Sequence, residues 1–104
     1  MSDAVFTIPR QIEILSAEVL PIEVDVTDLL DDGETPSTPV ITLTDMTTGA
    51  AYASGLSGSP AFVGNVCGQT ITTLVGGHSY RLLLTFLAAV GKTRACALLI
   101  ECPF

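Results

Sequence analysis

The sequence predicts an all-β protein: a two-layer antiparallel β-sandwich of seven or eight strands with an N-terminal arm. Apolar and polar residues alternate with period two in several segments, β-branched residues are frequent, and turn-forming Gly, Pro and Asp recur at short intervals. Helical signals are weak. The 104 residues provide one domain and one core, which we divide into an arm, 1–16, and a sandwich domain, 17–104.

The first predicted strands are short and lie around a proline. Residues 5–8 and 11–15 are separated by Pro9, and a proline beside a strand is typical of a sheet edge or of a switch between sheets. The segment 19–30 is the next predicted strand. Its alternating apolar residues share one face: Ile22, Val24 and Val26. An Asp-Gly pair and two prolines then predict a loop over 31–39.

The middle of the chain contains several short predicted strands. These are 40–46, 51–54, 61–66 and 69–74. Residues 55–60, "GLSGSP", are rich in Gly and Ser and are expected to form a flexible loop. Gly64 and Gly68 are expected to mark a bulge and a turn.

The last part of the chain predicts a long antiparallel hairpin. Residues 78–89 and 92–102 flank "VG" at 90–91, a sequence suited to a tight turn. Alternation assigns one face to the core, with Tyr80, Leu82, Leu84, Phe86, Cys96, Leu98 and Ile100. The other face carries Leu83, Leu87 and Leu99, which a two-layer sandwich leaves exposed. Two explanations stand: a contact with another subunit, or cover by the N-terminal segment 1–15.

The stretch "LVGGHSY" at 74–80 predicts how the two sheets are joined. A tyrosine early in the penultimate strand, after a tight turn and a core leucine, resembles the tyrosine corner of immunoglobulin-like and fibronectin type III domains. In this interpretation Leu74 fills the core, Gly76 and Gly77 permit the turn, and Tyr80 closes it. We therefore expect an immunoglobulin- or fibronectin-III-like sandwich. His78 is expected to be a solvent-facing turn residue rather than a catalytic base, because no nucleophilic partner is recognisable beside it.

Charge and hydrophobicity narrow the class of function. Four basic residues against eleven acidic ones give a net charge of −7, which disfavours nucleic-acid backbones and anionic membrane surfaces as partners. Hydrophobic residues make up 48% of the chain and charged residues only 14%. Such a domain is expected to hide part of its surface against neighbours in an assembly, the alternative being a monomer with a Thr/Ser/Gly surface. The N-terminus lacks a secretory pattern, so we expect the chain to stay in a cytosol or to be assembled there.

The cysteines and the acidic cluster predict neither metal nor cofactor. Cys67, Cys96 and Cys102 lack zinc-site spacing and are expected to be reduced thiols, the alternative being a bridge from Cys67 to one of the other two. The acidic residues Asp25, Asp28, Asp31 and Asp32 depart from the calcium-loop pattern and are expected to form a solvated loop. No catalytic, cofactor-binding or metal residues are assigned. The chain is not expected to be an enzyme.

Most of 17–102 resembles a group of small virion proteins of tailed bacteriophages, immunoglobulin-like proteins of the fibre–tail adaptor type. The matching stretches are an N-terminal arm, "AEVLPIEVDVTDLLDDGET" and "LVGGHSYRLLLTFLAAVGKTRACALLIEC". They contain an acidic alternating strand, the turn Asp32–Gly33–Glu34, a Gly-Gly-x-x-Tyr motif and the hairpin Gly91–Lys92–Thr93.

The resemblance implies a non-enzymatic structural role in a virion assembled in the host cytoplasm. The expected function is an adaptor or connector in the tail, baseplate or neck, present in several copies of a symmetric assembly. The expected partners are other virion proteins of the tail, fibre, neck or capsid. Candidate interface residues are Phe6, Ile8 and Pro9 of the arm, which would add to a neighbour's sheet, and Leu83, Leu87 and Leu99.

Two alternatives to the adaptor are carried forward. A capsid decoration (cement) protein belongs to the same class and differs in copy number. A carbohydrate- or peptide-binding surface module belongs to another class. Sugar sites usually need exposed aromatic rings, and the chain has no Trp; Tyr52 is the candidate ring, with a hairpin contact as its simpler role.

Overall fold

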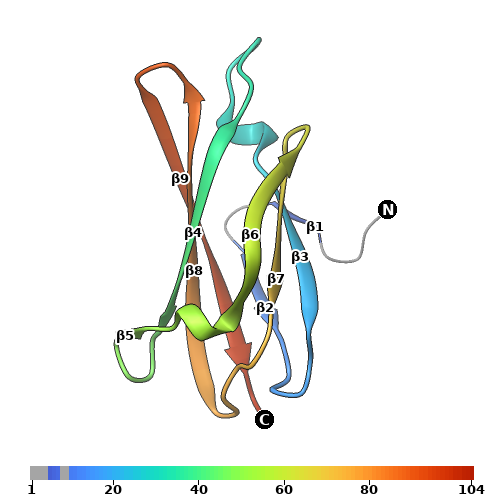
Figure 1. Cartoon of the computed structure of the whole chain (residues 1–104), viewed down its shortest axis with the longest axis vertical. Coiled ribbons are helices and arrows are strands. Elements are labelled where there is room, and N and C mark those ends of the chain that lie inside the picture. The colour runs from blue at the N-terminus through green and yellow to red at the C-terminus, as the bar shows by residue number, and fades with distance from the viewer. Residues whose placement is uncertain (1–4, 8–9) are drawn as a thin grey trace.

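The predicted all-β sandwich is confirmed. A computed structural model describes the backbone of residues 5–7 and 10–104, and the side chains from residue 12 onward. Two sheets face each other along the length of the molecule (Figure 1). In that part of the chain the only helical segments are two short 3₁₀ turns, Thr27–Leu29 and Ala53–Gly55.

One sheet has four strands and the other has five. The four-stranded sheet contains, in spatial order, β1 (Val5–Thr7), β3 (Leu20–Asp25), β7 (Val66–Ile71) and β6 (Leu56–Val63). The five-stranded sheet contains, in spatial order, β2 (Arg10–Glu13), β9 (Lys92–Cys102), β8 (His78–Ala89), β4 (Ser37–Asp45) and β5 (Ala50–Ala51). The order is that of the immunoglobulin fold, with strands A, B, E and D in one layer and G, F, C and C′ in the other.

Most strand pairs are antiparallel, and the two N-terminal strands are the exceptions. β1 runs parallel to β3, and β2 runs parallel to β9. The chain therefore crosses from one sheet to the other between these two short strands. The predicted arm comprises residues 1–16. Within it, β2 is the edge strand of the five-stranded sheet, and Ile14 is completely buried in the core.

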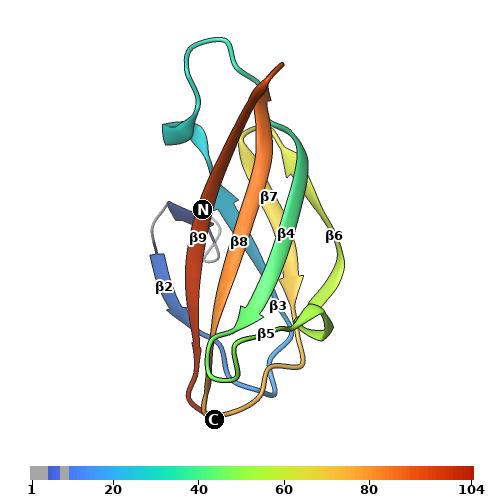
Figure 2. The same ribbon diagram turned by 90° about the vertical axis from the view of Figure 1, so that its left-hand side faces the viewer.

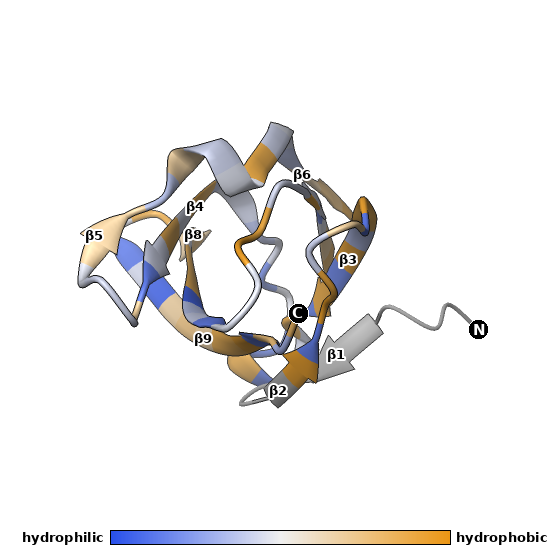
Figure 3. Cartoon of the chain, turned by 90° about the horizontal axis from the view of Figure 1, so that it is seen from below, coloured by the Kyte–Doolittle hydropathy of each residue, from blue (hydrophilic) through white to orange (hydrophobic). Residues whose placement is uncertain are grey.

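The core lies between the two sheets and is filled by alternate residues of the strands. β8 and β9 are the longest of the described strands and lie side by side (Figure 2). Their inward faces supply the largest share of the buried core residues. All seven residues predicted to face inward from this hairpin are buried: Tyr80, Leu82, Leu84, Phe86, Cys96, Leu98 and Ile100. Seen end-on, the apolar segments of both layers face one another (Figure 3). Phe62 of β6 meets Phe86 edge-on with ring centroids 5.5 Å apart, which links the layers.

Several predicted strand boundaries were wrong. The predicted strand 19–30 ends at Asp25, and Thr27–Leu29 forms a 3₁₀ turn. Residues 56–60 of the predicted loop 55–60 belong to β6, and Gly55 ends the 3₁₀ turn Ala53–Gly55. The register of β6 against β7 shifts between Ser57 and Ala61. This part of the strand is irregular, which is why residues typical of a loop are accommodated there.

Neither Gly64 nor Gly68 of the β6–β7 hairpin has the role that the sequence suggested. Gly64, expected at a bulge, lies in the turn with φ +61. Gly68, expected at a turn, is an ordinary residue within β7 and pairs with Glu23 and Ala61. The predicted strands 61–66 and 69–74 are therefore replaced by β6 and β7, which meet at Gly64–Asn65.

Candidate functional site

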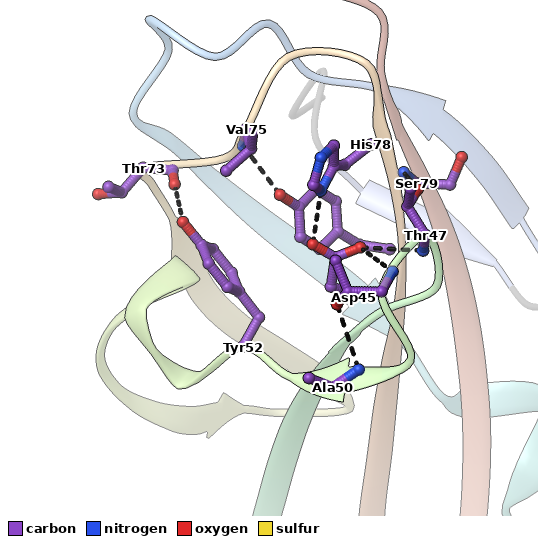
Figure 4. A network of polar contacts seen from close by, with 10 residues as sticks. Asp45, Thr47, Ala50, Tyr52, Thr73, Val75, His78 and Ser79 are labelled. Carbon is purple, nitrogen blue, oxygen red and sulfur yellow. Dashed lines mark hydrogen bonds and ion pairs between the residues drawn. The ribbon is translucent and has the colours of Figure 1, made fainter.

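The stretch 74–80 forms a corner that fixes the start of β8. Tyr80 is fully buried, and its hydroxyl accepts a hydrogen bond of 2.8 Å from the Val75 N–H (Figure 4). Leu74 is 4% exposed and belongs to the core. A hydroxyl bonded to the backbone a few residues upstream is the arrangement described for a tyrosine corner. Burial raises the pKa of Tyr80, so the hydroxyl stays protonated.

The two glycines of the corner serve different purposes. Gly77 has φ +85, a conformation that side chains other than glycine rarely adopt. Gly76 is needed for space, because a Cβ there would lie 2.9 Å from the backbone carbonyl carbon of Phe104. The Ser16 N–H donates to the Phe104 carbonyl oxygen over 2.9 Å. The corner thus holds the C-terminal residue against the turn that precedes β3.

Tyr52, the candidate ring for sugar stacking, is engaged within the corner. Its ring is half-buried and lies 5.3 Å from the ring of Tyr80, centroid to centroid. Its hydroxyl donates to the carbonyl oxygen of Thr73 (Figure 4). The ring therefore joins the segment after β5 to the segment before β8.

His78 lies on the strand rather than in the turn, and it pairs with a buried carboxylate. Its Nδ1 is 2.7 Å from Oδ2 of Asp45, a residue only 4% exposed at the end of β4. Burial opposes ionisation of Asp45, but hydrogen bonds from His78 and from the N–H groups of Thr48 and Thr47 outweigh it and lower the pKa of the carboxyl. An ionised carboxylate only accepts, so Nδ1 of His78 carries the proton. No local sequence pattern signals this pair, because the two residues lie 33 positions apart.

The neighbouring serine does not extend this pair into a catalytic triad. Ser79 points to the opposite face of β8, where its hydroxyl donates to Glu101 Oε2 over 2.7 Å. A nucleophile must lie within hydrogen-bond reach of its base, and Ser79 is turned away from His78. The Asp45–His78 pair therefore anchors the β4–β5 turn to the start of β8.

The outer face of the five-stranded sheet is the second candidate site. Leu87 and Leu99 are 37% and 44% exposed, and Leu83 between them is half-buried. Val40 of β4, which the sequence analysis did not single out, is 55% exposed beside them and pairs with Thr85. The predicted segregation of apolar residues onto both faces of the last hairpin is thus present. Val40 follows the regular alternation of β4, in which Ile41 and Leu43 are buried, and the irregularity of the register lies before it, between Ser37 and Val40.

One alternative predicts that the N-terminal segment 1–15 covers the outer face. Within this segment, the backbone of residues 10–13 instead extends the sheet at its edge by pairing with β9. The side chain of Phe6 and the residues Ile8 and Pro9 lie outside the part of the chain that the structure describes.

The acidic loop is tied to the tip of the last hairpin by one lysine. Lys92 Nζ lies 2.6 Å from Asp31 Oδ2 and 3.0 Å from Glu34 Oε2. The hydrogen bond from Lys92 lowers the pKa of Asp31. The pKa of Glu34 is lowered mainly by a hydrogen bond from the Asp31 N–H and, after that, by the hydrogen bond from Lys92. Asp25 instead accepts hydrogen bonds from Thr27. Among the described residues, no group of three or more His, Cys, Asp or Glu side chains is placed to hold a metal ion.

A shallow depression lies on the four-stranded sheet. It has a volume of about 680 Å³ and lies over Gly68, between β3 and β6. Its described lining is formed by Leu20, Pro21, Ile22, Glu23, Ser57, Gly58, Ser59, Gly68, Gln69 and Thr70. Gln69 Nε2 donates to the carbonyl oxygens of Ser57 and Gly58 and so supports the irregular part of β6. This lining contains no aromatic ring for stacking on a sugar.

The three cysteines are buried and unpaired, as expected for small hydrophobic residues. Burial raises the pKa of the Cys67 thiol and of the Cys96 thiol to about 11. Thiolate is the reactive form, so these cysteines are protected from oxidants and alkylating reagents.

Two further observations bear on function. No helix in the described residues is both long and apolar enough to cross a membrane. Comparisons with protein-family models, with curated protein sequences and with solved structures found no match to this chain.

Proposed function

We propose that the chain is a non-enzymatic structural subunit of a bacteriophage virion, an adaptor or connector in the tail, baseplate or neck region. The observation that carries the proposal is the apolar outer face of the five-stranded sheet. Leu83, Leu87, Leu99 and Val40 lie together on β8, β9 and β4, and three of them are more than one-third exposed. Contiguous apolar surface on a small domain marks a protein interface.

The rest of the molecule supports a building block better than a reaction centre. The polar groups of the corner are paired with one another: Tyr80 with Val75, Tyr52 with Thr73, and His78 with Asp45. These bonds connect loops at one end of the sandwich and stiffen it. A stiff domain with one apolar face transmits position between larger partners, which is the requirement for an adaptor.

The assignment to a virion rests on the resemblance of residues 17–102 to small tailed-phage proteins. The motifs that carry it have defined roles in the structure. Gly77 and Tyr80 of the Gly-Gly-x-x-Tyr motif make the corner, and Gly91, with φ +76, makes the tight turn of the Gly-Lys-Thr hairpin. Lys92 of that hairpin holds the acidic loop.

Mass spectrometry of purified virions from the encoding phage tests this proposal. The chain should be present in mature particles and should be lost together with tail or neck components when particles are dissociated. Its absence from mature particles would exclude a virion role. Copy number separates the adaptor from the alternative decoration protein, because an adaptor follows the symmetry of the tail and a decoration protein covers the capsid surface in many copies.

A further inference from the structure

On the outer face of the five-stranded sheet, the β8 leucines lie beside smaller residues of β9. On β8 the outward side chains are Arg81, Leu83, Thr85 and Leu87. Their partners on β9 are, in the same order, Leu99, Ala97, Ala95 and Thr93. Leu83 therefore lies beside Ala97, and Leu87 lies beside Thr93.

We infer that this face binds a second copy of the same chain about a two-fold axis that runs along the strands between β8 and β9. Such an axis places β8 of each copy over β9 of the other at the same height. Leu83 then meets Ala97 of the second copy, Leu87 meets Thr93, and Thr85 meets Ala95. Facing layers pack best where large residues oppose small ones. A two-fold contact also requires the surface to be complementary to itself.

Charge favours the same pairing. The chain carries a net charge of −7, so two copies repel each other over most of their surface. The four outward rows from Arg81 to Leu87 on β4, β8 and β9 contain no carboxylate, and Arg81 is their only charged residue. Glu101 lies one outward position further along β9, where it pairs with Ser79. The proposed axis brings Arg81 of each copy within reach of Glu101 of the other.

The area is sufficient for a contact at the small end of the standard range. β8, β9, β4 and β2 have 12, 11, 9 and 4 residues. At about 3.4 Å per residue and about 4.8 Å between strands, they present a face on the order of 600 Å². Two such faces bury roughly 1,200 Å² in total, the lower limit of an interface of standard size. The inference rests on the proposed function only in treating this face as a subunit contact.

Sedimentation equilibrium of the full chain tests the inference directly. Wild type should form dimers at micromolar concentration. Ala95→Arg, which puts a long charged side chain on the exposed part of β9 that faces the second copy, should be monomeric, and so should Leu83→Asp. Val63→Asp is the matched control, because Val63 is 81% exposed on β6 in the other sheet, and this variant should dimerise like wild type. Circular dichroism confirms that each variant is folded.

A charge exchange tests the register of the two copies. Arg81→Glu should weaken the dimer about tenfold, because it places like charges together, and the double variant R81E/E101R should restore the wild-type constant. A dimer that survives Ala95→Arg would overturn the proposed face, and a double variant as weak as R81E would overturn the proposed axis. A monomeric wild-type chain that is nevertheless found in virions would refute self-association and leave the proposed function standing. A chain that dimerises in solution but is absent from virions would support self-association and refute the proposed function.

Discussion

At the scale of single residues, the corner shows how few side chains fix the relation between loops. Gly77 supplies the turn conformation, Gly76 leaves room for the backbone of Phe104, and Tyr80 binds the Val75 N–H from inside the core. Each requirement is met by one residue type, which is why a short stretch of sequence predicts this feature. The contact between Asp45 and His78 is not predictable from a short stretch of sequence, because it forms only when β4 and β8 pair.

Replacement of Tyr80 by Phe should destabilise the fold by about 1–2 kcal/mol, because it leaves the Val75 N–H without its acceptor. Tyr52→Phe is the matched control. The hydroxyl of Tyr52 binds a carbonyl group that water can reach, so its loss should cost about 0.5 kcal/mol or less. Urea unfolding of both variants measures the two values. Equal losses would contradict a special role for the corner.

The Asp45 carboxylate makes the stability of the protein depend on acid. Its pKa in the folded state lies below the value of 3.8 expected without these partners. The stabilisation is complete above that value and is lost as the pH falls through the lower folded-state pKa. The stability difference between wild type and Asp45→Asn should therefore shrink as the pH falls from about 4 through the lower folded-state pKa of Asp45.

Thr47→Val is the control for this titration, because it removes an acceptor of the Ser79 N–H in the same turn without removing a charge. Its stability difference from wild type should stay constant over the same pH range. Urea unfolding at each pH gives both curves. An Asp45→Asn difference that is independent of pH would show that the charge of Asp45 contributes nothing.

At the scale of elements, the sequence predicted the long last hairpin and its two faces best. The two long strands are joined by a tight turn at 90–91, and the core residues of the hairpin are those expected. Short elements were predicted less well. β6 contains Gly58, Ser59 and Pro60, which are typical of loops, and it remains a strand because β7 and Gln69 bind it. The candidate contact face was found in part: its leucines follow from alternation, whereas Val40 and the alanines of β9 are placed beside them by strand order.

The loop between β3 and β4 depends on the tip of the β8–β9 hairpin. Lys92→Met should leave global stability nearly unchanged, since exposed ion pairs contribute little. It should speed hydrogen–deuterium exchange of the amides in 31–35, because Asp31 and Glu34 lose their shared cation. Lys92→Arg should preserve the slow exchange, and exchange in the centre of β8 should not change. Unaltered exchange in the loop of the Met variant would show that the loop is held by its own turn.

At the scale of the whole molecule, the distribution of apolar and charged residues separates one face from the others. The carboxylates of the described chain lie mainly in the loop after β3 and near the ends of the strands, whereas the outward rows of β4, β8 and β9 from Arg81 to Leu87 lack them. Like charge opposes contact through the acidic regions and leaves these rows as the proposed contact surface. This division of the surface supports the proposed role as a structural subunit.

The most direct test of this account is a cryo-electron microscopy reconstruction of the intact virion in which the chain is located. The account predicts that Leu83, Leu87 and Leu99 are buried against protein, either a second copy or a neighbouring virion component, while the corner at Tyr80 keeps its intramolecular bonds. A reconstruction in which this sheet face is open to solvent and the chain is held elsewhere would contradict the account.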